Sequence, residues 1–201
     1  SIMVGRDISS TEDSLSDIPI VTSGHQVLPE KIIALKPDLV IVDASTGPKA
    51  AIESIAAFPK ALFQVASPLS PAQLECSYRP GGWTVRQLLH HCADSHGQAL
   101  FRFKHALTEE NPSIKAYDEG AWAQLPDYQL PAADALETIR LVHTRWVHLL
   151  HSMSTADFSR TYYHPEKQRT QTLGEVTLMY AWHGNHHLAH ISGLIDRNFD
   201  R

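Results

Sequence analysis

The sequence predicts a mainly helical protein, an antiparallel four-helix bundle with a small α/β segment at its N-terminus. Two observations favour this fold class. Four long segments after residue 47 repeat apolar residues at the three- and four-residue spacing of amphipathic helices. The first 46 residues instead hold short apolar runs of the kind that forms strands. Amphipathic helices joined by long connections bury their apolar faces against one another in a bundle.

The N-terminal segment, residues 1–46, has an α/β pattern. Two short apolar runs, at residues 18–21 and 39–42, predict strands. Residues 29–35 predict a short helix, because a proline stands at its first position. Turn-forming residues follow the second strand, and we therefore expect the bundle to occupy residues 47–201 as a separate domain.

Four segments of the bundle domain are predicted to form long helices. Thr84 with Gln87 and Thr172 with Glu175 match the capping-box pattern that opens a helix. Pro59 interrupts the first helical segment, which predicts a kink or a break there. The expected helices span residues 49–66, 84–107, 132–153 and 172–197.

Long polar connections link these helices at residues 108–130 and 154–171. Connections of this length in a compact domain are usually functional or have small structure of their own. The first connection carries Tyr117 and Trp122, whose rings could either wall a pocket or anchor the connection to the bundle.

Composition and charge argue against several classes of protein. Apolar residues make up 43% and charged residues 19% of the 201 residues, which is typical of a globular chain. The net charge of −5 argues against a nucleic-acid-binding protein, which carries a basic balance. The chain shows neither an apolar run of the ~20 residues that cross a membrane nor a signal-peptide pattern. Two cysteines, Cys76 and Cys92, are too few for a disulfide scaffold, so we expect a cytoplasmic protein.

Histidine is the unusual feature of the composition. The chain has 13 histidines, and eight of them fall in two short segments of the second and fourth helices. In the fourth helix, His183 with His187 and His186 with His190 have the i, i+4 spacing that places both rings on one face. The apolar stripe of this helix continues through His183 and His187, whereas the other pair lies on its flank. We therefore expect His183 and His187 to point into the bundle as metal ligands.

The second helix is expected to supply a third ligand. His91 lies on the apolar side, next to small residues that leave room for a metal. His90 and Asp94 line the polar side, one turn apart. Asp94, His90 and Glu119 are candidates for acid–base roles or for supporting a ligand, and the sequence does not choose among them.

The remaining histidines have less specific interpretations. His143 faces inward on the third helix, where it is either a hydrogen-bonded core residue, a fourth ligand or a partner of a ligand. A buried, inert Cys92 is favoured over a soft metal ligand. Surface or packing roles are expected for His105, His148, His151 and His164.

Three inward histidines predict a catalytic metal site. Protonated imidazoles in a buried cluster would repel one another, and neutral imidazoles around a divalent ion avoid this cost. Three protein ligands leave a coordination position open, unlike the four-ligand sites that only stabilise a fold. Water bound at such a metal becomes a nucleophile, and a bound thiol loses its proton. The alternatives are structural histidines, or a metal that only stabilises a dimer.

Residues 48–201 also resemble the DinB/YfiT superfamily, and within it the YfiT branch of candidate metal-dependent hydrolases. The stretches that carry the resemblance follow the order of the predicted bundle. They are YRPGGWTVRQLLHHCADSH (78–96), RFKHALTEENPSIKAYDEGAWAQL (102–125), LVHTRWVHLL (141–150), YHPE (163–166) and YAWHGNHHLAHI (180–191).

The resemblance implies an up-down four-helix bundle, usually a homodimer, that holds one zinc or nickel ion per chain. The ligands of the superfamily are the second histidine of the HH pair and an H-x3-H pair, which correspond here to His91, His183 and His187. The implied activity is hydrolysis of a small-molecule substrate. Other members act with low-molecular-weight thiols such as bacillithiol, so a metal-dependent thiol S-transferase is the first alternative.

Residues 1–46 resemble a fragment of the periplasmic haem- or metal-binding proteins that serve ABC transporters. The stretches VGRDISSTEDS and IPIVTSGHQVLPEKIIALKPDLVIVDAS carry this resemblance. A 46-residue piece lacks most of the ligand cleft of those two-lobed proteins, and His25 is its one candidate ligand. We assign the segment no function of its own. A non-enzymatic haem- or metal-binding protein is the second alternative for the whole chain.

Overall fold

The computed structural model describes residues 22–23, 26–27 and 47–199 of the chain. The chain divides into two compact units, Ser1–Ser54 and Ile55–Arg201. In the first unit, β1 (Thr22–Ser23) and β2 (Gln26–Val27) pair as a short antiparallel sheet.

Most of the predictions for the N-terminal segment lie outside the described residues. These are the strands at residues 18–21 and 39–42, the helix at 29–35 and the candidate ligand His25. The boundary at residue 46 and the resemblance of residues 1–46 to a periplasmic binding protein stay predictions.

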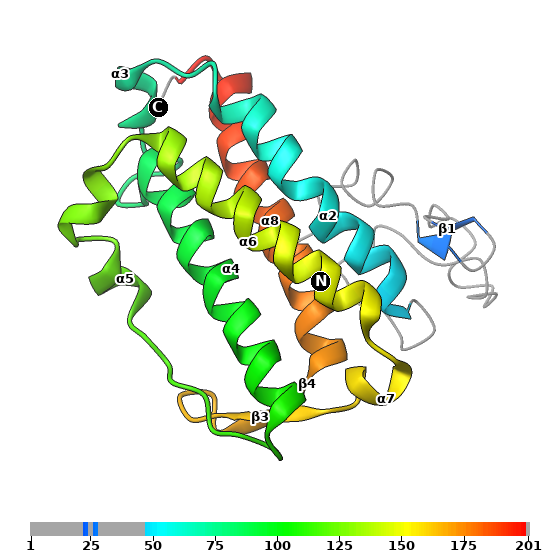
Figure 1. Cartoon of the computed structure of the whole chain (residues 1–201). Coiled ribbons are helices and arrows are strands. Elements are labelled where there is room, and N and C mark those ends of the chain that lie inside the picture. Colours follow the sequence, from blue (N-terminus) through cyan, green and yellow to red (C-terminus); the bar gives the residue numbers. More distant parts are fainter. Residues whose placement is uncertain (1–21, 24–25, 28–46, 200–201) are drawn as a thin grey trace, which may run out of the picture. The chain divides into compact units, whose positions relative to one another are not determined.

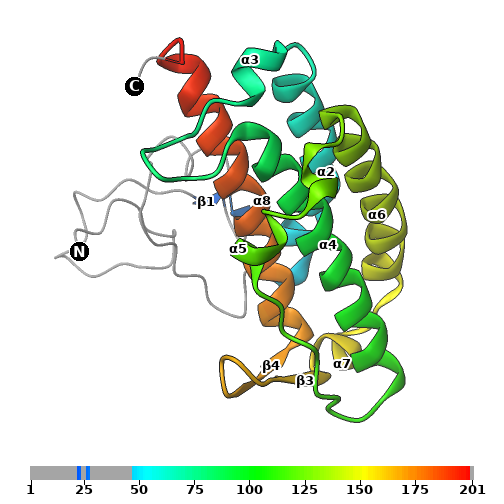
Figure 2. The same ribbon diagram turned by 90° about the vertical axis from the view of Figure 1, so that its left-hand side faces the viewer.

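Four long helices form the bundle, as the sequence predicts, and Figures 1 and 2 show them lying side by side. The part of α2 after Ser54 belongs to the same unit as the other three helices. None of the helices in the described residues is long and apolar enough to cross a membrane. The helices are α2 (Gly47–Ala66), α4 (Val85–Thr108), α6 (Ala132–Ser152) and α8 (Leu173–Asp196).

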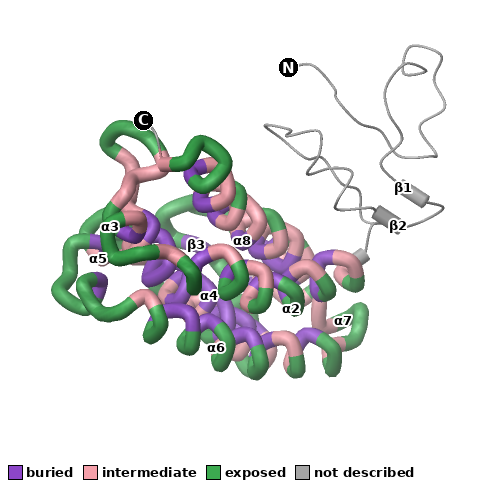
Figure 3. The backbone as a smooth tube through the Cα atoms, turned by 90° about the horizontal axis from the view of Figure 1, so that it is seen from above, coloured by how far each residue is buried: buried purple, intermediate pink, exposed green. Residues whose placement is uncertain are grey.

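The helices meet along their apolar stripes, which form one core. Figure 3 shows buried positions turned toward the centre of the bundle and exposed positions on its outer side. This segregation is what the periodicity of the four segments predicts. Fully buried members of the core include Leu62, Leu88, Leu89, Ile139, Trp146 and Ile191.

Capping boxes start α4 and α8 where the sequence predicts them. The Thr84 hydroxyl accepts from the backbone N–H of Gln87, and the Gln87 side chain accepts from the backbone N–H of Thr84. Thr172 and Glu175 make the same pair of bonds at α8. Each box satisfies two polar groups that a helix start otherwise leaves without partners, so these two ends are well defined.

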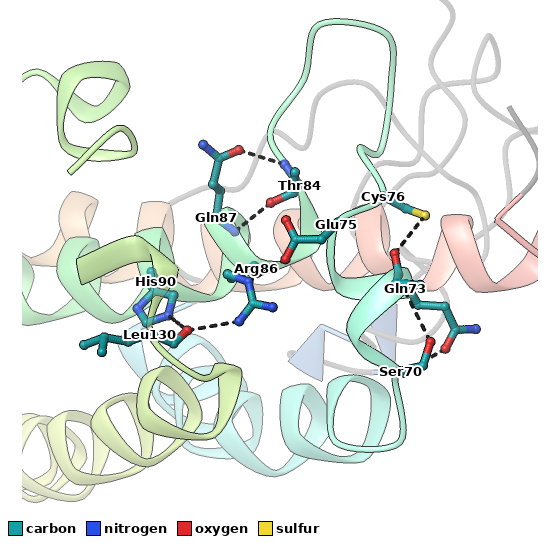
Figure 4. A network of polar contacts seen from close by, with 10 residues as sticks. Ser70, Gln73, Glu75, Cys76, Thr84, Arg86, Gln87, His90 and Leu130 are labelled. Carbon is teal, nitrogen blue, oxygen red and sulfur yellow. Dashed lines mark hydrogen bonds and ion pairs between the residues drawn. The ribbon is translucent and has the colours of Figure 1, made fainter. Parts of the chain in front are cut away.

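The helices α4 and α6 run in the same direction, so the antiparallel arrangement that the sequence predicts is wrong for this pair. Near the start of α4, the ring of His90 and the guanidinium group of Arg86 reach the carbonyl oxygen of Leu130, just before α6 (Figure 4). Halfway along, His96 of α4 contacts His143 of α6. The connection between the two helices therefore returns along the bundle before α6 begins.

This returning connection contains two short helical segments, α5 (Glu119–Trp122) and η3 (Pro126–Gln129). Figure 2 shows α5 in front of α8, at the middle of the bundle. The side chain of Gln87 holds the connection to α4 by donating to the carbonyl oxygen of Ala123. The long polar connection predicted at residues 108–130 thus covers one face of the bundle.

The second polar connection, between α6 and α8, also has structure of its own. It holds α7 (Thr155–Phe158) and a hairpin of β3 (Thr161–His164) and β4 (Arg169–Thr172). The hairpin is antiparallel, with Thr161 opposite Thr172. Alternation places His164 on the buried side of β3, although the sequence suggested a surface or packing role.

Of the kink or break predicted at Pro59, the break is absent, since α2 continues through Pro59 as one helix, and the kink stays a prediction. Proline has no backbone N–H, so the carbonyl oxygen four residues earlier loses its helical partner. That oxygen belongs to Ile55, and it accepts a hydrogen bond from Nδ1 of His143 at 2.8 Å. A side chain of α6 therefore replaces the missing bond.

Candidate metal centre

Three histidines from two helices meet inside the bundle, and they are the three that the sequence selects. Nε2 of His183 lies 3.2 Å from Nε2 of His91 and 3.1 Å from Nε2 of His187. The ligand atoms of all three lie within 4.8 Å of one another. Two imidazole nitrogens that each bind zinc at ~2.0–2.1 Å are about 2.9–3.4 Å apart, so the spacing fits one shared ion.

The rings are neutral in the folded protein. Burial lowers the pKa of His91 to about 4. Burial, together with the nearby His91 and His186, lowers the pKa of His183 to about 3. Burial and four neighbouring histidines lower the pKa of His187 strongly as well. Neutral imidazole is the form that binds a metal, so these nitrogens are available as ligands at neutral pH.

A chain of hydrogen bonds runs from the candidate ligand His183 to the backbone of α2. Nδ1 of His183 lies 3.0 Å from Nε2 of His96, which is fully buried. Nδ1 of His96 lies 2.7 Å from Nε2 of His143. The chain ends where Nδ1 of His143 meets the Ile55 carbonyl oxygen that Pro59 leaves free.

The carbonyl end of this chain fixes the proton on every ring. A carbonyl oxygen only accepts, so Nδ1 of His143 donates, and Nε2 of the neutral ring accepts from His96. His96 then donates through Nδ1 and accepts through Nε2 from Nδ1 of His183. The lone pair of His183 therefore lies on Nε2, which points at the other two candidate ligands. This arrangement suits a metal without any rearrangement of protons.

A pocket of about 330 Å³ opens beside the three histidines. It is large enough for a small molecule. The connection that holds α5, the β3–β4 hairpin and the inner faces of α4 and α8 all contribute side chains to it. Beside the three histidines, the lining includes Trp83, Ser95, Arg102, Tyr117, Glu119, His164, Glu166, Lys167, Met179, Tyr180, Trp182 and His186.

A family model described as the DinB superfamily matches residues 55–191. The chain belongs to the DinB superfamily. A protein of Bacillus pumilus strain SAFR-032, described as a candidate metal-dependent hydrolase, is 51% identical over 147 residues, 73% of this chain and 84% of the relative. A protein of Oceanobacillus iheyensis with the same description is 49% identical over 146 residues, with the same two shares.

A solved DinB-type structure agrees with the fold as well. YfiT from Bacillus subtilis superposes with a TM-score of 0.74 at 37% sequence identity, over 82% of this chain and 94% of YfiT. Its description is a probable metal-dependent hydrolase with an unusual four-helix bundle topology. The predicted membership of this superfamily is thereby confirmed.

Of the three candidate acid–base residues of this DinB-type chain, Glu119 alone is among those that line the pocket. Nε2 of His90 contacts the carbonyl oxygen of Leu130 at 3.2 Å, on the side of α4 shown in Figure 4. Asp94 accepts a hydrogen bond of 2.8 Å from the hydroxyl group of Tyr128. Both therefore hold the returning connection against α4, and their acid–base roles stay predictions.

The flanking pair of α8 lies beside the three candidate ligands. The His186 ring stacks on Trp182, with centroids 4.6 Å apart, and lines the pocket. The His190 ring stacks on Tyr78 at 4.1 Å. The thiol of Cys92 is buried, and burial raises its pKa, which suits an inert core residue.

Sequence reasoning left two residues of this region without a role. His96 was not assigned to a helical face, although it lies five residues after His91 and turns toward α6 and α8. Arg102 was not singled out at all. Its signal was available, since Arg102 lies seven residues after Ser95, which itself lies four residues after His91, on one stripe of α4.

We expect His96→Phe to weaken zinc binding by about 10–100-fold while one zinc still binds at saturation. Phenylalanine keeps a ring in the core but removes the acceptor for Nδ1–H of His183. The imidazole ring of His183 is then free to turn or to change its tautomer. Competition with a chromophoric chelator measures the affinity, and His105→Gln, an exposed change on the same helix, serves as control. A lower melting temperature with unchanged zinc affinity would show that His96 only packs.

Proposed function

We propose that this protein is a metal-dependent hydrolase that holds one divalent ion, zinc or nickel, on Nε2 of His91, His183 and His187. The observation that carries the proposal is the convergence of these three neutral rings on the lining of one pocket. The descriptions of the relatives from Bacillus and Oceanobacillus support the same reaction class.

A divalent ion in this position would supply Lewis acidity, which turns water into a nucleophile at neutral pH. The chain supplies the surroundings. Trp83 packs on the ring of His91, with centroids 4.6 Å apart, and excludes solvent from that side. Burial, together with Glu166, raises the pKa of Glu119, so this carboxyl group holds a proton more readily than a free glutamate does. We assign proton transfer in the pocket to Glu119.

Thiol S-transfer is the second candidate function. The pocket beside the histidines supports it, because a closed structural metal site would have no room for a thiol. Its volume beside the histidines would admit a small thiol to the open coordination position. Imidazole sites hold several divalent metals, and zinc among them has a high affinity for thiolates. The homodimer, the cytoplasmic location and the identity of the metal stay predictions.

Metal analysis followed by reconstitution tests the proposal. We expect about one zinc or nickel ion per chain in the purified protein, and its removal by a chelator should abolish activity. The stripped protein, reloaded with zinc or with nickel, is screened against ester, amide and lactone substrates and against electrophiles with an added thiol. Activity that needs no metal would refute a metal-dependent enzyme. Turnover only with a thiol would favour the transferase.

A further inference from the structure

Arg102 is a buried cation in the candidate substrate pocket. It stands on α4, eleven residues after His91, and its side chain is among those that line the pocket. Only 8% of the residue is exposed. Helical side chains lean toward the N-terminal end of their helix, so the guanidinium group reaches back in the direction of His91.

The contacts of this guanidinium group are with tyrosine side chains. Its central carbon lies 6.0 Å from the ring centre of Tyr117, and the group interacts with the hydroxyl groups of Tyr162 and Tyr180. Its Nε atom is buried without a hydrogen-bond partner. Among the described residues, none of the ion pairs within 4.0 Å involves Arg102. Burying a charge without a direct ion pair is unfavourable, so the presence of Arg102 calls for a reason.

The other charged groups that line the pocket make no direct ion pair with Arg102 among the described residues. Glu119, Glu166 and Lys167 are exposed. Desolvation raises the pKa of Glu119, and Arg102 opposes this only through its charge, without an ion pair within 4.0 Å. His164 is buried, and burial followed by the charge of Arg102 lowers its pKa, which keeps it neutral. Arg102 is therefore the buried cation among the described residues that line the pocket.

One side chain links Arg102 to the metal centre. The hydroxyl group of Tyr180, with which Arg102 interacts, donates to the carbonyl oxygen of Ser95 at 3.0 Å. The Tyr180 ring also packs against the His183 ring, with centroids 5.5 Å apart. The guanidinium group and the His183 ring thus both contact Tyr180, and Arg102 lines the same pocket of about 330 Å³ as the three histidines.

We propose that Arg102 binds an anionic group of the substrate, of the carboxylate type, while the reacting group of the same molecule lies at the histidine cluster. The planar guanidinium fork matches a carboxylate in a two-bond arrangement. The anion would supply the direct ion pair that the described residues do not. This inference rests on the proposed function, because it needs a metal at the other end of the pocket.

Two thiols of equal size test the inference on zinc-loaded protein. 3-Mercaptopropionate carries a carboxylate, and 3-mercaptopropionamide is its neutral counterpart, while the sulfur of either can bind zinc. Calorimetric titration should show wild type binding the carboxylate form about 10–100-fold more tightly, as expected for a buried charge-assisted pair. Arg102→Met should bind both thiols equally. Lys167→Met removes an exposed cation of the same pocket and should keep the preference.

One further variant and one further measurement separate the outcomes. Arg102→Lys keeps the charge and should retain part of the preference, which guards against a loss of folding in the methionine variant. A preference that persists in Arg102→Met, or is absent from zinc-loaded wild type, overturns the role of Arg102 and leaves the metal site intact. If the wild type holds no zinc, the proposed function fails instead. Acetate titrated into metal-free protein then tests directly whether Arg102 binds carboxylates. The ¹H–¹⁵N signal of the Arg102 Nε–H should shift if the site binds carboxylates and stay fixed if it does not.

Discussion

Replacing His187 with alanine is expected to remove the metal and, with it, the activity. The three Nε2 atoms form one compact set, so a variant keeps only two nitrogens and gains solvent in place of the third. Loss of a residue that only supports a ligand already costs about 10–100-fold in affinity, so loss of a ligand should exceed this. Metal content per chain should fall from about one to near zero, and hydrolytic turnover should fall by at least about 100-fold.

His190→Ala is the matched control for this experiment. It removes the same side chain from the same helix three residues later, where the ring stacks on Tyr78 and is not among the residues that line the pocket. It should keep its metal and most of its activity. The metal-dependent interpretation would have to be abandoned if His187→Ala retained a full equivalent of metal.

The candidate ligands could be found from the sequence because they obey helical periodicity. His183 and His187 continue the apolar stripe of α8, and His91 continues that of α4. Both stripes face the core, so the rings meet once the helices pack. The capping boxes at Thr84 and Thr172 were equally readable, since they depend only on residues three apart. Such local patterns need no knowledge of the tertiary arrangement.

What the sequence did not show depends on contacts between distant segments. The hydrogen-bond chain through His96 and His143 joins α8, α4, α6 and α2, and no periodicity marks it. The parallel course of α4 and α6 follows from the path of the connection between them. The length of that connection alone is compatible with either a parallel or an antiparallel pair. The absence of a break at Pro59 depends on a donor that lies 84 residues later in the chain, at His143.

Proline usually breaks a helix, but Pro59 instead supplies a hydrogen-bond acceptor that this fold uses. It frees the one carbonyl oxygen that anchors the tautomer of His143, and through His96 the tautomer of His183. Neutral rings are essential to this arrangement, because a second proton on His96 or His143 would set two donors against each other. Metal binding at this centre and the stability of the bundle are thus expected to depend on pH in the same way.

The metal-free protein is accordingly expected to lose stability steeply below pH 6.5. Burial lowers the pKa of His91 and of His143 from 6.5 to about 4 in the folded state. Between these values the unfolded chain binds protons that the folded chain does not, so stability rises with pH in this window and is lost as pH falls. Each histidine contributes about 1.4 kcal/mol per pH unit, so the two together remove roughly 7 kcal/mol of stability between pH 6.5 and about pH 4. A domain stable by ~5–15 kcal/mol then loses between about half and all of its stability near pH 4.

Urea unfolding at several pH values, from about 4.5 to about 8, measures this slope. Bound zinc should move the loss to lower pH, because the metal competes with protons for His91 and its two partners. His151→Gln, an exposed change on α6, should leave the slope unaltered. A stability that stays level from about pH 7 to about pH 5 would mean that the buried rings are not held neutral by the fold. In that case the proton order deduced from the Ile55 carbonyl oxygen, and the readiness of His183 to bind a metal, would both be wrong.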